Sequence, residues 1–337
     1  MSGCGSSRGP RTVPHPRTPS DAEVGSERND AETVDASVVS DADLDVAMGL
    51  DLAVSLDLGS EPDAGGETGP FDRRSYDVLS TRTLSADGAD AGQGAYDLIR
   101  AFGGSRPIEA PDLYPENHPD VPHIYEDSDE IVGDHFVFTL HRDLDIDRDR
   151  LEITDRQRNE IKTYGGSEDA VKGFEGETLI YRWRFRINPQ MEVSRRFTHF
   201  FQLKAVGGSD AQPILTISGS ERSGEDGIEV RHSPLQSTTL LGRRDWSLVT
   251  GEWLEAYCRA TYSEQGELRL IVLRRRDREV IFDLDLTGLD LWRGETPEHF
   301  VRPKWGIYRS ILEPENLRAD EERVRFADFS VEKVILR

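Results

Sequence analysis

Short runs in which apolar and polar residues alternate follow one another from about residue 95 to the end of the chain. Alternation with a period of two is typical of β-strands, because successive side chains of a strand point to opposite faces of a sheet. Helical periodicity is hardly present. The predicted strands are 135–140, 158–164, 178–187, 198–205, 214–218, 228–232, 253–262, 267–274, 279–286, 304–310 and 324–336. Many short strands separated by Gly-rich and polar turns predict an all-β, two-sheet jelly-roll sandwich.

The first part of the chain has a different composition. From Arg8 to about Phe71 it consists mainly of Asp, Ala, Ser, Gly, Pro, Glu and Thr, and no aromatic residue precedes Phe71. Such a segment cannot bury enough apolar surface to fold. Apolar residues alternate between 44 and 58, but nothing nearby offers such a strand a partner. We therefore predict a disordered acidic tether over residues 1–94 and one folded domain over residues 95–337.

The formal charge of −23 is concentrated in the first part of the 337 residues. Residues 151–337 contain 29 Lys and Arg against 32 Asp and Glu, whereas residues 1–150 contain 12 against 32. A nucleic-acid partner is not expected, because phosphate binding needs a concentrated basic surface. An anionic sugar polymer that meets a local basic groove in the second part remains compatible with this distribution. No apolar run reaches the ~18 residues that a membrane span needs.

The chain has two cysteines, Cys4 and Cys258. Small residues precede Cys4 as they precede the lipid-carrying cysteine of a bacterial lipoprotein signal, although the basic and apolar parts of such a signal are missing. We expect lipidation at Cys4 and a secreted or envelope-anchored, extracytoplasmic protein; a chance cysteine in a disordered leader is the alternative. Cys258 alternates with Ala256 and Ala260 in a strand-like run, which favours a small core residue.

Three of the predicted strands carry polar residues two positions apart, and therefore on one strand face. We expect Arg158, Gln202 and Tyr308 to converge from these strands onto one concave surface. Gly306, which shares the face of Tyr308, leaves room there for a ligand. The three sets are Arg158, Glu160 and Lys162; Gln202 and Lys204; and Lys304 and Tyr308.

In this order, the three segments resemble the signatures of jelly-roll polysaccharide lyases, the alginate lyase class with R-[ST]-E-L-R, Q-I-H and Y-F-K-A-G-x-Y-N-Q. The resembling segments are 158–162, 199–204 and 302–310, and the third is also similar to glucuronan and heparin lyase relatives. The resemblance spans roughly residues 130–337. It implies a concanavalin A-like sandwich that acts without a redox cofactor on alginate, glucuronan or a glycosaminoglycan-like polymer. We expect a monomer, and we assign no metal-binding residue from the sequence.

The resemblance also implies roles for the residues. A lyase removes the proton on C5 of a uronic acid and expels the 4-linked sugar, so it needs a base, an acid and groups that neutralise the carboxylate. Tyr308 is expected to act as base and acid, and Arg158 and Gln202 to hold the carboxylate. A non-catalytic, carbohydrate-binding sandwich is the alternative.

Further residues are expected to contact the substrate. Trp305 lies inside the third segment, where an indole ring can stack on a sugar. Arg184 belongs to a strand with three arginines on one face, which either line an anion-binding groove or form a solvated face balanced by neighbouring acids. The predicted substrate-binding residues are Lys162, Glu160, Lys304, Arg309, Trp305 and Arg184.

The chain departs from the lyase signatures at Lys204, which stands where a histidine is expected. Lys204 itself acts as a base only if its pKa is strongly lowered. His199 is expected on the strand face opposite Gln202, and therefore in the core or at an edge. The acidic run 143–149 resembles the start of a calcium loop but lacks its turn glycine and closing glutamate, so we predict a solvated acidic turn.

Overall fold

The computed structural model of the chain describes residues 71–90, 92–235 and 237–337. These residues form 15 β-strands, one α-helix and four short 3-10 turns (Pro111–Leu113, Asp169–Val171, Trp246–Leu248 and Pro314–Asn316). Cys4 and the tether as far as residue 70 lie outside the described residues. No helix in the described part of the chain has the length and apolarity needed to cross a membrane.

One sheet, sheet A, has eight strands, and all its pairings are antiparallel. The long strand β15 pairs with β6 along one edge and with β4 and β1 along the other. In spatial order, the strands are β13 (Val280–Leu289), β12 (Gly266–Arg274), β11 (Trp253–Thr261), β6 (Thr178–Ile187), β15 (Glu321–Leu336), β4 (Gly133–His141) and β3 (Ile124–Asp129), with β1 (Tyr76–Leu84) beside β15.

The other sheet, sheet B, has seven antiparallel strands. Strand β14 (Phe300–Ser310) lies between β7 (Thr198–Val206) and β5 (Arg156–Lys162), although these three strands are far apart in the sequence. In spatial order, the strands are β10 (Thr239–Asp245), β9 (Glu225–His232), β8 (Leu215–Arg222), β7 (Thr198–Val206), β14 (Phe300–Ser310), β5 (Arg156–Lys162) and β2 (Ile108–Glu109).

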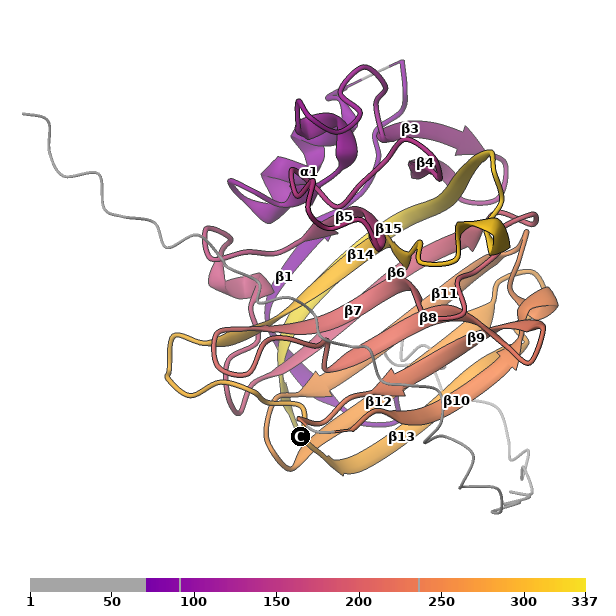
Figure 1. Cartoon of the computed structure of the whole chain (residues 1–337). Helices are drawn as coiled ribbons and strands as arrows, with labels where there is room; N and C mark the ends of the chain where they lie inside the picture. Colours follow the sequence, from indigo (N-terminus) through magenta and orange to yellow (C-terminus); the bar gives the residue numbers. More distant parts are fainter. Residues whose placement is uncertain (1–70, 91, 236) are drawn as a thin grey trace, which may run out of the picture. The chain divides into compact units, whose positions relative to one another are not determined.

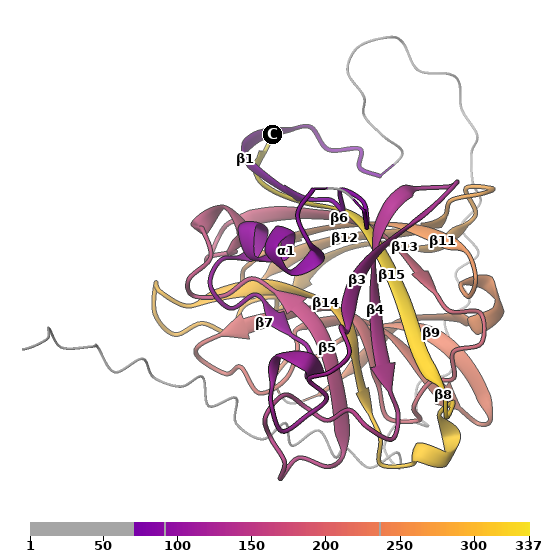
Figure 2. The same ribbon diagram turned by 90° about the horizontal axis from the view of Figure 1, so that it is seen from above.

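The two sheets pack face to face around a core of aromatic side chains (Figures 1 and 2). Trp305 of sheet B lies at its centre, with ring centroids 5.8 Å from Phe201, 6.1 Å from Trp183 and 5.2 Å from Phe329. Cys258 is also fully buried there, as predicted. Because the inward faces of both sheets are apolar, the predicted fold class, an all-β two-sheet jelly-roll sandwich, is confirmed.

All the strands predicted from alternation are present, with bounds that differ by a few residues. Four strands are additional: β1, β2, β3 and β10. β1 corrects the predicted domain boundary, because Tyr76–Leu84 pairs with β15 and closes sheet A, so the folded domain begins before residue 95. Helix α1 (Ala95–Gly103) follows, and its buried Ile99 and Phe102 cover one end of the core; the Phe102 ring lies 6.5 Å from that of Trp305.

Gly306 has a different role from the one predicted. Its φ of +147° is one that other residues rarely adopt. A Cβ atom at this position would meet the carbonyl oxygen of Asn159 at 2.1 Å and the Cα atom of Glu160 at 2.6 Å. Glycine is therefore required because the backbone of β5 passes close to β14, and it leaves no room for a ligand.

Candidate functional site

The outer face of sheet B, which points away from the core, brings together polar residues from β5, β7 and β14. In register, Tyr308 lies opposite Arg158, and Lys304 lies opposite both Lys162 and Gln202. The guanidinium carbon of Arg158 lies 3.8 Å from the centroid of the Tyr308 ring. Arg158, Gln202 and Tyr308 thus converge from three strands because β14 runs between the other two.

Tyr308 lies between two guanidinium groups and is only 4% exposed. Arg156 donates a hydrogen bond from Nη1 to the Tyr308 hydroxyl oxygen at 2.9 Å, while Arg158 lies over the ring. The pKa of Arg156 is raised, first by its hydrogen bond to Asp155 and also by Tyr308. Two adjacent cations favour the ionised form of a phenol. The Tyr308 hydroxyl oxygen thus accepts a hydrogen bond from one guanidinium group, while a second guanidinium group lies against the ring.

The carboxylate of Glu109, from the edge strand β2, lies among the cations of this face. Its oxygens are 2.8 Å from Nζ of Lys162, 2.8 Å from Nζ of Lys304 and 3.3 Å from Nη1 of both Arg158 and Arg148. Burial alone would raise the pKa of Glu109, but the four cations hold it well below its usual range. Glu109 therefore remains ionised and compensates the positive charge of the face.

Two more carboxylates complete this arrangement. Glu160 lies opposite Glu109 in register and is 2.9 Å from Nη1 of Arg158 and 2.8 Å from Nζ of Lys304. Asp147 accepts a hydrogen bond from Nε of Arg158 at 2.8 Å. We call these residues the charged cluster: Glu109, Asp147, Arg148, Arg158, Glu160, Lys162 and Lys304. Four cationic side chains against three carboxylates give the charged cluster a formal net charge of +1.

Gln202 and Lys204 share the outer face of β7. Gln202 donates from Nε2 to Oε1 of Glu160, which joins it to the charged cluster. Lys204 lies opposite Arg302 in register and donates to the carbonyl oxygen of Ala211 at 3.3 Å. The amide of Gln202 and the ammonium group of Lys204 thus extend the polar outer face of sheet B along β7.

His199 also lies on this face, so the prediction that it faces away from Gln202 is wrong. The pairing of β7 with β8 has an irregularity between His199 and Phe201, where one extra residue interrupts strict alternation. The irregularity places His199 opposite Tyr308 in register, with ring centroids 5.8 Å apart. Sequence reasoning missed His199 because a bulge has no clear signal in alternation.

The imidazole of His199 is held in its neutral form. Burial lowers its pKa first, and Arg231, Arg158 and the lysines of the face lower it further, to well below the usual value for histidine. Its Nδ1 lies 2.7 Å from Oγ of Ser218. The ring beside Tyr308 is therefore uncharged, and its Nδ1 is engaged by Ser218.

Two residues of the third motif point to the core instead. Trp305 is fully buried among the core aromatics, so it offers no sugar platform. Arg309 is also fully buried and donates from Nε and Nη2 to Oε1 of Gln157 at 3.0 and 2.9 Å. Both predictions are wrong for the same reason: odd-numbered positions of β14 face the core, opposite to Tyr308.

Arg184 lies on the other sheet. It belongs to β6 in sheet A, where it forms an ion pair with Asp328 and lies 3.5 Å from Glu255. The neighbouring Arg182 likewise pairs with Glu332. The prediction that Arg184 binds substrate in an anion-binding groove is therefore wrong, and the alternative of a solvated face balanced by acids is confirmed.

The acidic run 143–149 is not the solvated turn that we predicted. Asp145 and Asp147 are buried, because Asp147 pairs with Arg158 and Asp145 meets three histidines. These histidines, His118, His123 and His141, form with Asp145 the one group among the described residues whose composition suits a metal ion. The spacings H-x4-H and H-x3-D are the sequence signal that could have indicated it.

No protein-family model matches this chain, and no curated protein matches it. Similar solved structures include the endo-β-1,4-glucuronan lyase of the fungus Trichoderma reesei, with a TM-score of 0.42, 11% identity and coverage of 67% of this chain and 93% of that one. The alginate lyase from Klebsiella pneumoniae has a TM-score of 0.42 and 10% identity, with coverage of 64% of this chain and 85% of that one. The marine alginate lyase from Aplysia kurodai has a TM-score of 0.48 and 11% identity, with coverage of 76% of this chain and 98% of that one.

Proposed function

We propose that the outer face of sheet B binds a uronic-acid polymer and cleaves it by β-elimination, with Tyr308 as base and acid. The hydrogen bond from Arg156 to the Tyr308 hydroxyl, together with Arg158 over the ring, carries this proposal. A free tyrosine loses its proton only near pH ~10, so a catalytic tyrosine needs neighbouring cations to act as a base at neutral pH. Tyr308 has two.

In the proposed reaction, the phenolate of Tyr308 removes the proton from C5 of the uronic acid. Negative charge then develops on the sugar carboxylate, to which Arg158 and Gln202 donate hydrogen bonds. The C4–O4 bond breaks as the C4=C5 double bond forms, and Tyr308 returns the proton to the leaving O4. The products are a saturated end and an unsaturated uronate, and no external oxidant or reductant is needed.

His199 extends this proposal. The lyase signature has a histidine where this chain has Lys204, and the family resemblance gives that histidine the role of a second base. His199 reaches the same face from three residues before Gln202, and its ring lies beside Tyr308 in a neutral state. We therefore propose His199 as an alternative acceptor of the C5 proton, with Tyr308 then acting only as the acid that protonates O4, and Lys204 as a carboxylate-binding cation.

A binding-only function is the second candidate, and the burial of the proposed base favours it. The carboxylate of Glu109 already lies 2.8 Å from Lys162 and from Lys304, so a sugar carboxylate has to compete with an internal one under either function. Tyr308 and Arg158 are also almost fully buried. A sandwich that only holds an acidic polymer along this face needs no access to the phenol.

An assay for the unsaturated product separates the two candidates. The purified chain is incubated with alginate, glucuronan, a heparin-like polymer and a neutral glucan, while the ultraviolet absorbance of the C4=C5 uronate is followed. The proposal expects absorbance to rise with at least one acidic polymer and not with the glucan. Retention on an acidic polymer in affinity electrophoresis without any product would reject the lyase and support the binding module.

The proposal includes an extracytoplasmic location, because polymers of this kind are found outside cells. The lipid anchor expected at Cys4 would keep the enzyme at the envelope. Incorporation of a labelled fatty acid into the wild-type chain, and its loss in Cys4→Ser, tests the anchor independently of the chemistry. Equal labelling of the two chains would remove Cys4 from the proposal.

A further inference from the structure

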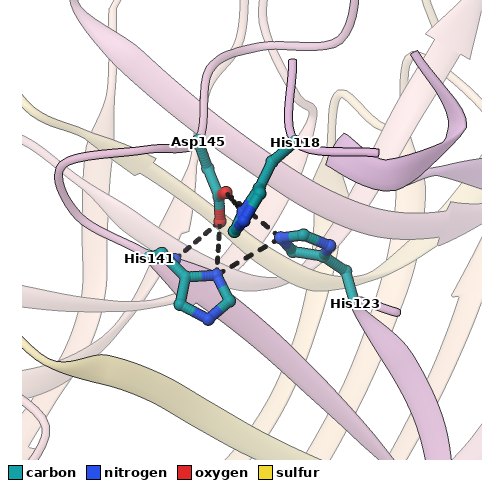
Figure 3. A group of neighbouring side chains, drawn as sticks. All are labelled: His118, His123, His141 and Asp145. Carbon is teal, nitrogen blue, oxygen red and sulfur yellow. Dashed lines mark hydrogen bonds and ion pairs between the residues drawn. The ribbon is translucent and has the colours of Figure 1, made fainter. Parts of the chain in front are cut away.

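Three histidines and an aspartate meet beside the charged cluster, where β4 ends (Figure 3). His118 and His123 come from the segment before β3, His141 is the last residue of β4, and Asp145 belongs to the loop that follows. One ligand atom from each residue lies within 4.8 Å of all the others. His123 and Asp145 are fully buried, while His118 and His141 are about one-fifth exposed. Side chains from two stretches of the chain, 118–123 and 141–145, thus converge on a single point.

Several of the distances between the ligand atoms are close to those between the ligands of one small ion. Oδ1 of Asp145 is 2.8 Å from Nδ1 of His118 and 3.1 Å from Nε2 of His123. Nδ1 of His141 is 3.3 Å from Nε2 of His123 and 3.4 Å from Oδ2 of Asp145. A tetrahedral zinc ion with bonds of about 2.0–2.1 Å separates its ligands by about 3.3 Å. The three imidazole rings are nearly perpendicular, at 76°, 79° and 84°, as rings arranged around one ion can be.

The outward sides of the ligands are held as zinc ligands usually are. Nδ1 of His123 lies 2.6 Å from the carbonyl oxygen of Val121 and 3.3 Å from Asp112. Nε2 of His141 lies 3.2 Å from Oε2 of Glu321. Histidine ligands of zinc typically donate their second N–H to a carbonyl or carboxylate, which fixes the ring and strengthens the metal bond. Here the carboxylates also supply negative charge around a cation.

We propose that His118, His123, His141 and Asp145 bind one zinc ion, as a structural site. Three imidazole nitrogens and a carboxylate oxygen are ligands that zinc accepts, and four protein ligands close its coordination. A closed site has no position for a substrate or water, so its role is to hold segments of the chain together. This role is independent of whether sheet B cleaves a polysaccharide.

The zinc site would fix the loop that supplies the charged cluster. Asp147, two residues after the ligand Asp145, accepts the hydrogen bond from Arg158. Asn117, next to His118, donates to the carbonyl oxygens of Ile146 at 3.1 Å and Arg148 at 2.8 Å. The ion would therefore stabilise the position of Asp147 and Arg148 on the outer face of sheet B.

The test uses the full chain, freed of metal with a chelator and then titrated with zinc in competition with a chromophoric chelator. His118→Gln is the main variant, because His118 is partly exposed and its loss leaves the core intact. His299→Gln, which replaces a histidine far from the group in the sequence and outside it, is the matched control. We expect one zinc ion per wild-type chain, binding weakened by about a hundredfold or more in His118→Gln, and unchanged binding in His299→Gln.

Two further measurements complete the test. Zinc should raise the thermal midpoint of the wild type and of His299→Gln, and leave that of His118→Gln nearly unchanged. Cobalt in place of zinc should give the intense visible absorption of a tetrahedral site in the wild type and in His299→Gln, and not in His118→Gln. Absence of stoichiometric zinc binding, equal binding by His118→Gln, or the weak spectrum of six-coordinate cobalt would each overturn the proposal and leave a hydrogen-bonded cluster.

Discussion

Arg156 connects Tyr308 to Asp155 through a single guanidinium group. Nη1 donates to the Tyr308 hydroxyl oxygen at 2.9 Å, while Nε and Nη2 donate to Asp155 at 2.7 and 2.8 Å. The carboxylate therefore fixes the orientation of the cation that acts on the phenol. In the proposed lyase, Arg156 is a positioning residue whose charge determines how easily Tyr308 loses its proton.

Arg156→Gln should shift the pH dependence of the elimination reaction toward alkaline pH. Loss of an adjacent positive charge disfavours the phenolate, and one such charge shifts an ionisation by about 1 unit or more. The rising limb of kcat/KM against pH should move by that amount. Arg182→Gln on sheet A, which breaks the ion pair with Glu332, is the control and should leave the profile in place. An unchanged profile in Arg156→Gln would separate Arg156 from the chemistry.

Tyr308→Phe should abolish turnover and preserve sugar binding. The ring, which packs against Arg158 and Phe197, is retained, whereas the oxygen that transfers the proton is lost. General acid–base groups contribute about 10²–10⁴-fold, so kcat should fall at least about a hundredfold while the dissociation constant of an oligouronate stays within about threefold. Tyr257→Phe, which loses a hydroxyl bonded to Asp72, is the control. Substantial activity in Tyr308→Phe would assign the base to another residue.

His199→Gln should lower kcat and leave KM nearly unchanged, because the neutral imidazole is assigned to proton transfer rather than to substrate charge. The expected loss of kcat is about a hundredfold. Adding Lys204→His to His199→Gln places an imidazole at the position where the lyase signature has a histidine. We expect this double variant to regain part of the lost kcat. A loss of stability with unchanged kcat per folded molecule would instead make His199 a packing residue.

Alternation along the chain predicted the sandwich and the meeting of Arg158, Gln202 and Tyr308, because side-chain direction in a regular strand follows from position alone. The same rule, applied consistently, would have sent Trp305 and Arg309 to the core, since both are an odd number of positions from Tyr308. His199 was misplaced for the opposite reason: a β-bulge interrupts the rule where sequence gives no sign of it.

Long-range pairing explains what sequence patterns missed. Glu109 enters the charged cluster only because β2, a strand of two residues, joins the edge of sheet B next to β5. We predicted that Asp145 and Asp147 are solvated because acidic runs normally lie at the surface. In the structure, however, Asp145 contacts three histidines and Asp147 forms an ion pair with Arg158. The partners of a buried charge are determined by tertiary contacts, which one sequence does not display.

Lys162 should make oligouronate binding weaken at mildly alkaline pH. Burial lowers the pKa of Lys162 to about 8, against the opposing effect of Glu109. Its ammonium is charged below that pH and neutral above it, so the attraction for an anion is lost as pH rises through about 8. Calorimetric titration of an oligouronate across this range should show the decrease. Lys162→Arg should remove the dependence and keep the affinity, whereas Lys162→Met should show weak binding at every pH. An equally strong decrease in Lys162→Arg would contradict this prediction.

Glu109→Gln should destabilise the fold while freeing cations for an anionic ligand. The folded-state pKa of Glu109 lies well below its usual value because four cations surround it. Its contribution to the free energy of unfolding is therefore present at pH values above about 4 and is lost as the pH falls through the folded-state value. Loss of this buried charge should cost about 3 kcal/mol at neutral pH and much less in acid.

The matched control for Glu109 is Asp283→Asn, which breaks the ion pair of an exposed carboxylate with Arg269 and should change stability by less than about 1 kcal/mol. Urea unfolding at neutral and acidic pH measures both variants, and titration with an oligouronate measures affinity. If Glu109 occupies the place of a substrate carboxylate, Glu109→Gln should bind the oligouronate more tightly than the wild type. Reduced stability together with unchanged affinity would show that Glu109 supports the cations without competing with a substrate carboxylate for them.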